Sequence, residues 1–362
     1  MEKEKALIGM SGGVDSSVAA FLTKEAGFDC MGATMRLFVP PEEELSESRC
    51  CALEDVEDAR AVARRLEIPF HVFNFKEDFA RQVMDKFVRS YEAGLIPNPC
   101  IDCNRHLKFD RLLRRAMELG CNYVVTGHYA RIRRDETTGR YLLCRAADPA
   151  KDQTYFLACL NQEQLAHTRF PLGELTKAQV RQIAEEKGFV NARKRDSQDI
   201  CFVPDGDYAA FLTRYTGKTY PEGNYIDEQG NILGRHKGAV CYTLGQRKGL
   251  GIALGAPAYV CGKDMQANTV TLGSNDSLFS KALVAGDWNW YPFPTLEQPM
   301  AVTAKIRHSQ FEQAATVYPL EDGKARVVFE QPQRAVTPGQ AVVLYLDDVV
   351  VGGGTILAAE KE

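Results

Sequence analysis

"LIGMSGGVDSSVAAFL", residues 7–22, joins a short apolar run to a helix-like pattern through two adjacent glycines. The apolar run reads as a buried strand, and the residues after the glycines have helical periodicity. Gly12 and Gly13 allow the backbone to turn sharply and to approach a ligand closely. The following helix presents unsatisfied N–H groups and the positive end of its dipole at the same place. The stretch therefore predicts an anion site between a strand and a helix.

The side chains of this turn also favour an anion. Ser11, Ser16 and Ser17 can add hydroxyl donors, and Asp15 offers a carboxylate to Mg²⁺. The turn has no G-K-[ST] and no G-x-G-x-x-G, so neither a Walker A loop nor a dinucleotide site is expected. A glycine turn without a ligand is the alternative, but strand, serines, aspartate and helix follow one another in the order that a phosphate site needs.

Alternating strand and helix patterns extend outward from this turn. They predict an α/β fold with a doubly wound parallel sheet, because β-α-β-α-β units place helices on both faces. The predicted strands are residues 5–10, 28–38, 70–75 and 121–132, and the predicted helices are residues 14–27, 53–68 and 106–120. Helical character continues over 151–200, where Thr176 and Gln179 have the spacing of a capping box.

The character of the chain changes beyond about residue 216. Short alternating strands are separated there by frequent glycine and proline, which is typical of all-β structure. Dense glycines near 245–255 and a seam near 280 suggest two small β units. We expect a phosphate-binding catalytic domain at 1–205, a small central β domain at 206–280 and a β-barrel at 281–362.

Composition indicates a globular protein without a membrane segment. Of 362 residues, 45% are hydrophobic and 25% charged, and no window is apolar enough to cross a bilayer. The opening residues carry charge and no long apolar run, so we expect a cytoplasmic protein. The net charge of −4 gives no overall reason to bind nucleic acid. Basic residues are nevertheless dense over 103–150, which fits either a basic binding face or a solvated helix face.

A second motif, "PNPCIDCNRHLKFD" at residues 97–110, contains a C-x-x-C pair. Cys100 and Cys103 could hold zinc, close a redox disulfide, ligate an iron–sulfur cluster or supply a nucleophile. Zinc is disfavoured because the adjacent Cys50 and Cys51 lack the spacing of a second pair of ligands. A helix beginning near Asn104 would lower the pKa of the Cys103 thiol, together with the nearby Arg105 and His106.

The turn at residues 11–17 resembles that of the PP-loop ATP pyrophosphatases, which implies transfer of AMP to a carbonyl oxygen. The ordered motifs of the whole chain resemble those of the tRNA-specific 2-thiouridylases, which replace the C2 oxygen of the wobble uridine with sulfur. The match runs from about residue 5 to the final strands, and its motifs are "SGGVDSS", "NPCIDCN", "TGHYAR", "KDQTYFL", "DSQDICFV", "TLGQRKGLGI" and "TPGQ".

The chemistry of that reaction agrees with the residues present. An unreactive uracil carbonyl oxygen becomes a leaving group on adenylation, and a sulfur nucleophile then displaces it. By resemblance, Cys201 carries a persulfide, and Cys103 is the nucleophilic partner that closes a transient Cys103/Cys201 disulfide. A buried core thiol is the alternative for Cys201, although the polar residues before it favour a loop.

The resemblance also implies binding residues. The implied ATP contacts are Gly9, Met10, Ser11, Gly12, Gly13, Val14, Asp15, Ser16, Met35 and Gly127. The implied tRNA contacts are Asn98, Pro99, Cys100, His128, Lys151, Asp152, Gln153, Arg307, His308 and Gln340. Asn98 to Cys100 would face the extruded uridine, because its C2 oxygen is out of reach in a stacked anticodon. Implied partners are tRNAs for Lys, Glu and Gln and a cysteine desulfurase or sulfur-relay protein.

One departure from the family pattern leaves two chemistries open. The family more often has Asp where this chain has Cys100. Cys100, Cys103 and Cys201 could therefore ligate three irons of a [4Fe-4S] cluster whose fourth iron delivers sulfide. The persulfide route needs no cluster, and we favour it. Two further alternatives are a PP-loop ligase that delivers ammonia, which would not need these cysteines, and a non-catalytic RNA-binding protein with half a zinc site.

Overall fold

The computed structural model describes residues 3–38, 53–194 and 200–361 of the chain. The acidic stretch at 40–48, Cys50, Cys51 and residues 195–199 lie outside these ranges. The first part of the fold is a five-stranded parallel sheet in the order β3-β2-β1-β4-β7. Its strands are β1 (Lys5–Gly9), β2 (Asp29–Arg36), β3 (Phe70–Asn74), β4 (Tyr123–Val125) and β7 (Thr168–Arg169).

Both faces of this sheet are covered by helices, which confirms the doubly wound arrangement. Ala6 and Ile8 of β1 pack into one core cluster with α1 (Val14–Glu25), α2 (Leu53–Arg65) and α9 (Lys177–Glu186). Leu7, between them, points to the opposite face and packs with α4 (Asp85–Glu92) and α6 (Leu112–Glu118). The alternation follows from the two-residue period of a strand.

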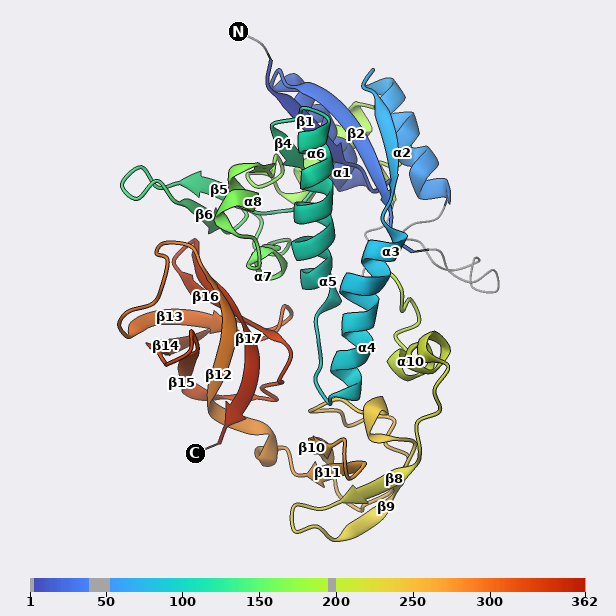
Figure 1. Ribbon diagram of the computed structural model, residues 1–362, viewed down its shortest axis with the longest axis vertical. Helices are drawn as coiled ribbons and strands as arrows, with labels where there is room; N and C mark the ends of the chain where they lie inside the picture. The colour runs from blue at the N-terminus through green and yellow to red at the C-terminus, as the bar shows by residue number, and fades with distance from the viewer. Residues whose placement is uncertain (1–2, 39–52, 195–199, 362) are drawn as a thin grey trace.

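The longest helical segment is continuous from Pro99 to Glu118 and stands near the centre of the molecule (Figure 1). It comprises α5 (Pro99–Asp102), the π-helical η3 (Cys103–Arg111) and α6. The predicted helix 106–120 is thus confirmed, but its start near Asn104 is wrong. The helix begins at Pro99 because the Asn98 side chain caps it, accepting the Cys100 N–H at 3.2 Å.

A second helical run lies beside it in Figure 1 and was not predicted from the sequence pattern. It comprises α3 (Lys76–Phe79), the π-helical η2 (Ala80–Met84) and α4. The shorter helices are α7 (Thr154–Leu157), α8 (Gln162–Ala166) and α10 (Tyr208–Thr216). The capping box predicted at Thr176 and Gln179 is confirmed at the start of α9.

The predicted strand 121–132 is wrong in one respect, because it is two strands. β4 ends at Val125 and β5 (Arg131–Arg134) begins after a five-residue segment that leaves the sheet. The backbone N–H of Tyr129 in that segment donates to the Gln153 side chain at 2.9 Å instead of to a strand. β5 pairs with β6 (Tyr141–Cys144) as an antiparallel hairpin.

Two β units follow the parallel sheet, as predicted. The first is a four-stranded sheet in the order β10-β11-β8-β9, with its own apolar core around Tyr225, Val260 and Val270. Its strands are β8 (Gly223–Ile226), β9 (Ile232–His236), β10 (Tyr259–Asp264) and β11 (Thr269–Gly273).

The second unit is a closed β-barrel, which confirms the barrel expected at the end of the chain. Six strands follow the order β12-β15-β14-β13-β16-β17, and β17 pairs back with β12. Closure leaves the barrel without free sheet edges and encloses a core that includes Val317, Val327 and Phe329. The strands are β12 (Phe279–Trp290), β13 (Met300–Lys305), β14 (Gln313–Pro319), β15 (Ala325–Arg334), β16 (Ala341–Leu346) and β17 (Val349–Glu360).

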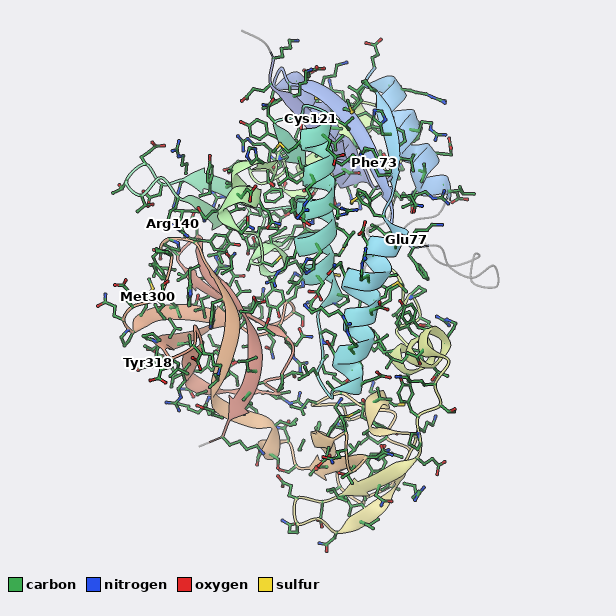
Figure 2. The ribbon with its side chains drawn as sticks, viewed as in Figure 1. Phe73, Glu77, Cys121, Arg140, Met300 and Tyr318 are labelled. Carbon is green, nitrogen blue, oxygen red and sulfur yellow. The ribbon has the colours of Figure 1, made fainter. Side chains whose placement is uncertain are left out.

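The barrel is tied to the parallel-sheet part by the β5–β6 hairpin. Cys144 of β6 pairs with Val349 of β17, so the hairpin extends the barrel sheet. Arg140, labelled in Figure 2 where the hairpin approaches the barrel, donates to the carbonyl oxygens of Trp290 at 2.9 Å and Tyr291 at 2.6 Å. Residues far apart in sequence thus make one junction, which the sequence pattern did not predict.

Candidate active site

The strand order places a crevice next to the glycine turn. The chain adds β2 and β3 on one side of β1 and then crosses over to add β4 and β7 on the other side. The strand order therefore reverses between β1 and β4. In open parallel sheets, ligands bind at the carboxyl ends of strands at such a switch point. The turn at residues 10–13 follows β1, and Gly127 follows β4. The two predicted ATP-binding segments therefore meet at one edge.

Glycine is required at the centre of the turn. Gly12 has a φ of +78°, and a Cβ there would lie 2.3 Å from the carbonyl oxygen of Asp55. A Cβ on Gly127 would lie 2.7 Å from the backbone of Asp15 and Ser16. The turn is therefore packed backbone to backbone against α2 on one side and the β4 segment on the other.

The hydroxyl groups of the turn are engaged inside it. The Ser16 and Ser17 hydroxyls donate to the Gly13 carbonyl at 3.0 and 3.1 Å, and Ser16 Oγ accepts the Ser11 N–H at 3.2 Å. Gly13 is the N-cap of α1, and no side chain caps that end. The N–H groups of the first helical turn have no partner within a helix. These N–H groups, more than the serine hydroxyls, are the donors suited to a phosphate.

Met10 and Val14, two of the predicted ATP contacts, have buried side chains and could offer a ligand only their backbone groups. The Met10 side chain is buried among the helices below the sheet, and Val14 packs in the same cluster. The Met10 carbonyl accepts the Thr34 hydroxyl at 2.6 Å, which holds the turn against β2. Met35 is only partly buried and lies on the opposite face of β2.

Asp15 has two partners that the sequence pattern did not reveal. Lys177 Nζ, at the start of α9, lies 2.6 and 2.8 Å from the two Asp15 oxygens. The Tyr129 hydroxyl donates to Asp15 Oδ1 at 2.8 Å. The carboxylate thus faces a cation and a hydroxyl. A Mg²⁺ ion needs only one or two carboxylates beside phosphate oxygens, so Asp15 suits it if Lys177 is displaced.

His128 lies beside this crevice on the segment after β4. Its Nδ1 is 2.7 Å from the Thr126 hydroxyl, and its Nε2 is 3.4 Å from Lys108 Nζ. Burial, and then the Lys108 charge, hold the pKa of His128 well below its ordinary value of 6.5. The imidazole is therefore neutral at physiological pH, with a partner at each ring nitrogen.

Cys103 of the central helix and Cys201 pack against one core cluster. Cys103 and Cys201 are both partly buried and pack against the same core cluster, which includes Phe79, Phe87 and Phe202. Cys100 is exposed. Because the helix begins at Pro99, Cys100 occupies its first turn, and the helix dipole acts more strongly there than at Cys103. The helix-head argument expected for Cys103 therefore applies to Cys100 instead.

Six further cysteines lie among the described residues, four of them buried and two partly buried. Desolvation raises the pKa of six thiols, to about 11 for Cys30 and about 12 for Cys159. The other four are Cys121, Cys144, Cys241 and Cys261. A raised pKa keeps a thiol protonated and a poor nucleophile.

The described residues hold no group of ligands for a single metal ion. Within residues 3–38, 53–194 and 200–361, no three His, Cys, Asp or Glu side chains come together around one site. Cys100, Cys103 and Cys201 belong to these ranges and do not form such a single-ion site.

A cavity of about 160 Å³ separates the helix start from the barrel. Asn98, Arg105 and Tyr155 line it, together with Gly339 and neighbouring strand residues of the barrel. Gln340 lies between the lining residues Gly339 and Ala341, and its Nε2 donates to the Ile96 carbonyl at 3.0 Å. The structure thus brings the predicted contacts Asn98 and Gln340 to one junction.

The other predicted tRNA contacts have partners within the fold. Asp152 accepts the Ala146 N–H at 2.9 Å, and Gln153 accepts the Tyr129 N–H at 2.9 Å. Arg307 donates to the Ala335 carbonyl at 3.1 Å and the Thr337 hydroxyl at 2.9 Å. His308 stacks on Phe156 with 4.5 Å between ring centroids. Pro99 is buried in α5, and Lys151 lies in a turn.

No helix among the described residues is long and apolar enough to cross a membrane.

Sequence reasoning missed Tyr129, Lys177, Asn191 and Lys194, which all contact the phosphate turn or its supports. Only Lys177 had a local signal, because it directly follows the capping residue of α9.

Three family descriptions match successive parts of the chain. They are a tRNA methyl transferase HUP domain at residues 4–205, a tRNA methyl transferase PRC-barrel domain at 209–274 and an aminomethyltransferase beta-barrel domain at 280–356.

Curated relatives match over nearly the whole chain. The tRNA-specific 2-thiouridylase MnmA of Clostridioides difficile is 50% identical over 353 residues, which cover 98% of each chain. Its counterpart in Acetivibrio thermocellus is 52% identical over 358 residues, covering 98% of this chain and 100% of the relative. A solved NMN synthetase from Francisella tularensis is 17% identical and covers 60% of this chain and 79% of its own, at a TM-score of 0.36.

Proposed function

The chain belongs to the tRNA-specific 2-thiouridylase family, and from that premise we propose that it is the enzyme that thiolates the wobble uridine of tRNA at C2, using ATP. The observation that carries the proposal is identity of about half the residues over 98% of the chain. Transfer of sulfur to tRNA follows from the family. The route through adenylation and a cysteine persulfide is our inference from the site.

ATP would bind with its phosphates at the head of α1. The contacts proposed are Gly9 to Ser16, with Met35 and Gly127 flanking the nucleotide. The glycine turn and the uncapped helix end support this, because both suit close approach of an anion. Asp15 would hold Mg²⁺, which would supply charge neutralisation at the phosphates. Lys177, next to Asp15, would then be released toward them.

The first chemical step would be attack of the uridine C2 oxygen on the α-phosphorus of ATP. A P–O bond forms to that oxygen, the bond to the β-phosphate oxygen breaks, and pyrophosphate leaves. The proton on uracil N3 passes to solvent as the C2 oxygen, now bonded to AMP, becomes part of a leaving group. His128 is neutral and near the turn, so it is a suitable group to hydrogen-bond the base.

Sulfur transfer would follow from Cys201. The terminal sulfur of its persulfide attacks C2, and AMP leaves with the original oxygen. The Cys103 thiolate then attacks Cys201 Sγ, and the sulfur–sulfur bond breaks with its electron pair going to the sulfur on C2. The products are 2-thiouridine and a Cys103/Cys201 disulfide, which two electrons from a thiol reductant must reopen. The Cα atoms must come within about 4.4–6.8 Å at that step.

The partial exposure of Cys103 and Cys201 supports these two cysteines. Both lie at the margin of one core cluster, whereas Cys30, Cys121, Cys144 and Cys159 are buried thiols. The persulfide route needs no cluster, so no step is derived through one.

The remaining assignments concern the RNA and the partners. We assign the extruded uridine to Asn98, Pro99, Cys100 and His128. The other proposed tRNA contacts are Lys151, Asp152, Gln153, Arg307, His308 and Gln340. We divide the chain into residues 1–205, 206–280 and 281–362. A cysteine desulfurase or relay protein would load Cys201, the acceptors would be tRNAs for Lys, Glu and Gln, and the enzyme would act in the cytoplasm.

The test is a reconstituted reaction with unmodified tRNA, ATP, Mg²⁺, cysteine and a cysteine desulfurase. We expect 2-thiouridine in the nucleoside digest and stoichiometric pyrophosphate. Cys201→Ser should release pyrophosphate but form no 2-thiouridine, because activation precedes sulfur transfer. A protein that transfers methyl groups, which the family-domain descriptions name, would release no pyrophosphate here and would methylate the tRNA only when a methyl donor is added; that result would refute the proposal.

A further inference from the structure

The turn that follows α9 contributes a buried side chain, Asn191, that contacts the phosphate turn. Asn191 is only 3% exposed, and its Nδ2 donates to the Gly12 carbonyl at 2.8 Å and to Ser17 Oγ at 2.9 Å. It comes from a segment more than 170 residues further along the chain. Both protons of the amide are thus directed into the loop that would bind ATP.

The directions of these hydrogen bonds are fixed. Ser17 Oγ donates its own proton to the Gly13 carbonyl at 3.1 Å, so it must accept from Asn191. The amide therefore places its nitrogen toward the loop and its oxygen away. Asn191 Oδ1 is buried and has no hydrogen-bond partner among the described residues. Leaving a buried amide oxygen without a hydrogen-bond partner costs free energy. The amide is oriented this way nevertheless, which points to a role for its two donated hydrogen bonds.

These donors control where the loop's own N–H groups point. In a planar trans peptide, the N–H of one residue is antiparallel to the carbonyl before it. Holding the Gly12 carbonyl toward Asn191 turns the Gly13 N–H to the opposite side. Ser17, oriented by Asn191, does the same through the Gly13 carbonyl for the Val14 N–H. The N–H groups so turned are those at the head of α1.

The same turn also forms ion pairs with α2, the helix on which Gly12 packs. Lys194 Nζ lies 2.5 Å from Asp55 Oδ1 and 2.6 Å from Asp58 Oδ2 on α2. Gly12 packs directly on the Asp55 backbone. The loop is therefore held between Asn191 and a helix that Lys194 anchors.

We propose that Asn191 is a positioning residue for the nucleotide: it orients the phosphate-binding N–H groups of the Gly12–Gly13 turn without touching ATP. This rests on the proposed function, because it assigns the turn to ATP. Asn191 would act on ATP use alone, since neither sulfur loading at Cys201 nor tRNA binding involves the Gly12 carbonyl.

The test compares Asn191→Ala, the isosteric Asn191→Asp and, as matched control, Asn122→Ala. Asn122 also bonds a backbone group of the β1 region, accepting the Lys5 N–H at 2.8 Å, but at the far end of the strand. Both Asn191 variants should lower kcat/KM for ATP by roughly tenfold or more, the scale of a lost buried donor. The KM for tRNA and the persulfide content of Cys201 should stay at wild-type values. The control should match wild type throughout.

Ser17→Ala keeps the test decisive if an Asn191 variant does not fold. It should also raise the KM for ATP, and adding Asn191→Ala to it should cost less than the sum of the two single changes, because they share one bond. Wild-type ATP kinetics in Asn191→Asp, or equal losses for ATP and tRNA, would overturn the inference. Failure of wild-type protein to release pyrophosphate would instead refute the proposed function.

Discussion

Asp15 is the one carboxylate on the phosphate turn, and its charge is balanced by Lys177. Asp15→Asn keeps the shape of the side chain and removes the negative charge that a metal ion needs. We expect this variant to lose pyrophosphate release by at least two orders of magnitude, on the scale of a lost electrostatic contact. Binding of tRNA should change little, since Asp15 contacts neither the cavity nor the barrel. Normal turnover in a pyrophosphate assay would remove Asp15 from the site.

Cys100 distinguishes the two routes for sulfur. It is exposed on the first turn of the helix and is not grouped with Cys103 and Cys201 as a metal ligand. We expect Cys100→Asp, purified without oxygen and free of iron, to thiolate tRNA with a desulfurase as wild type does. A brown wild-type protein whose activity requires iron, with Cys100→Ala losing colour and thiolation together, would establish the cluster route instead.

His128 couples the site to pH. Its pKa in the folded protein lies well below 6.5, so the unfolded chain binds a proton that the folded chain does not as pH falls below 6.5. Its contribution to stability is therefore complete above about pH 6.5 and is lost progressively below it. We expect His128→Gln to flatten the decline in unfolding free energy between about pH 6.5 and 5, measured by urea titration. Parallel curves for variant and wild type would contradict the assigned pKa.

The helix of Cys103 shows what local sequence can and cannot reveal. Its apolar periodicity over residues 106–120 predicted the helix, but the first turn lies before the periodic residues and depends on a cap at Asn98. The π-helical stretch from Cys103 to Arg111 has no sequence signature either, because it reflects packing against neighbouring helices. The sequence placed the helix start five residues too late, so the effect of the helix dipole was assigned to Cys103 instead of Cys100.

Asn98 allows capping and base recognition to be separated. Asn98→Ala removes the acceptor of the Cys100 N–H and should lower the free energy of unfolding by about 1 kcal/mol. Asn98→Asp retains an acceptor and should keep wild-type stability, but it loses the amide donors proposed to face the uridine. We therefore expect Asn98→Asp to fold normally and to thiolate tRNA more slowly. Wild-type thiolation by Asn98→Asp would limit Asn98 to capping.

The phosphate turn was predictable because its elements are contiguous in the sequence. Strand, glycines and helix are contiguous in residues 7–22, so periodicity and residue type suffice to place them. Lys177 and Asn191 reach the same turn from more than 160 residues away, and no local pattern encodes that approach. Contacts of this kind depend on how α9 packs against α1.

At the scale of the molecule, the division into a parallel sheet and two β units was predictable from composition and turn residues. The joining of these parts was not. Arg105 pairs with Asp287 at 2.7 Å, Gln340 reaches the Ile96 carbonyl, and β6 extends the barrel sheet. Arg105 lines the cavity beside Asn98, and Ile96 and Gln340 are each next to residues that line it. A substrate that enters there would contact the helix of Cys103 and the barrel together.

The central claim is that the uridine C2 oxygen is activated by AMP and leaves with it. The most direct test supplies tRNA whose wobble uridine carries ¹⁸O at C2, together with ATP, desulfurase and cysteine, and determines the isotope in each product by mass spectrometry. We predict one ¹⁸O atom in the AMP for every 2-thiouridine formed, and none in pyrophosphate or water. Recovery of the label in water or inorganic phosphate, with unlabelled AMP, would contradict adenylation of that oxygen.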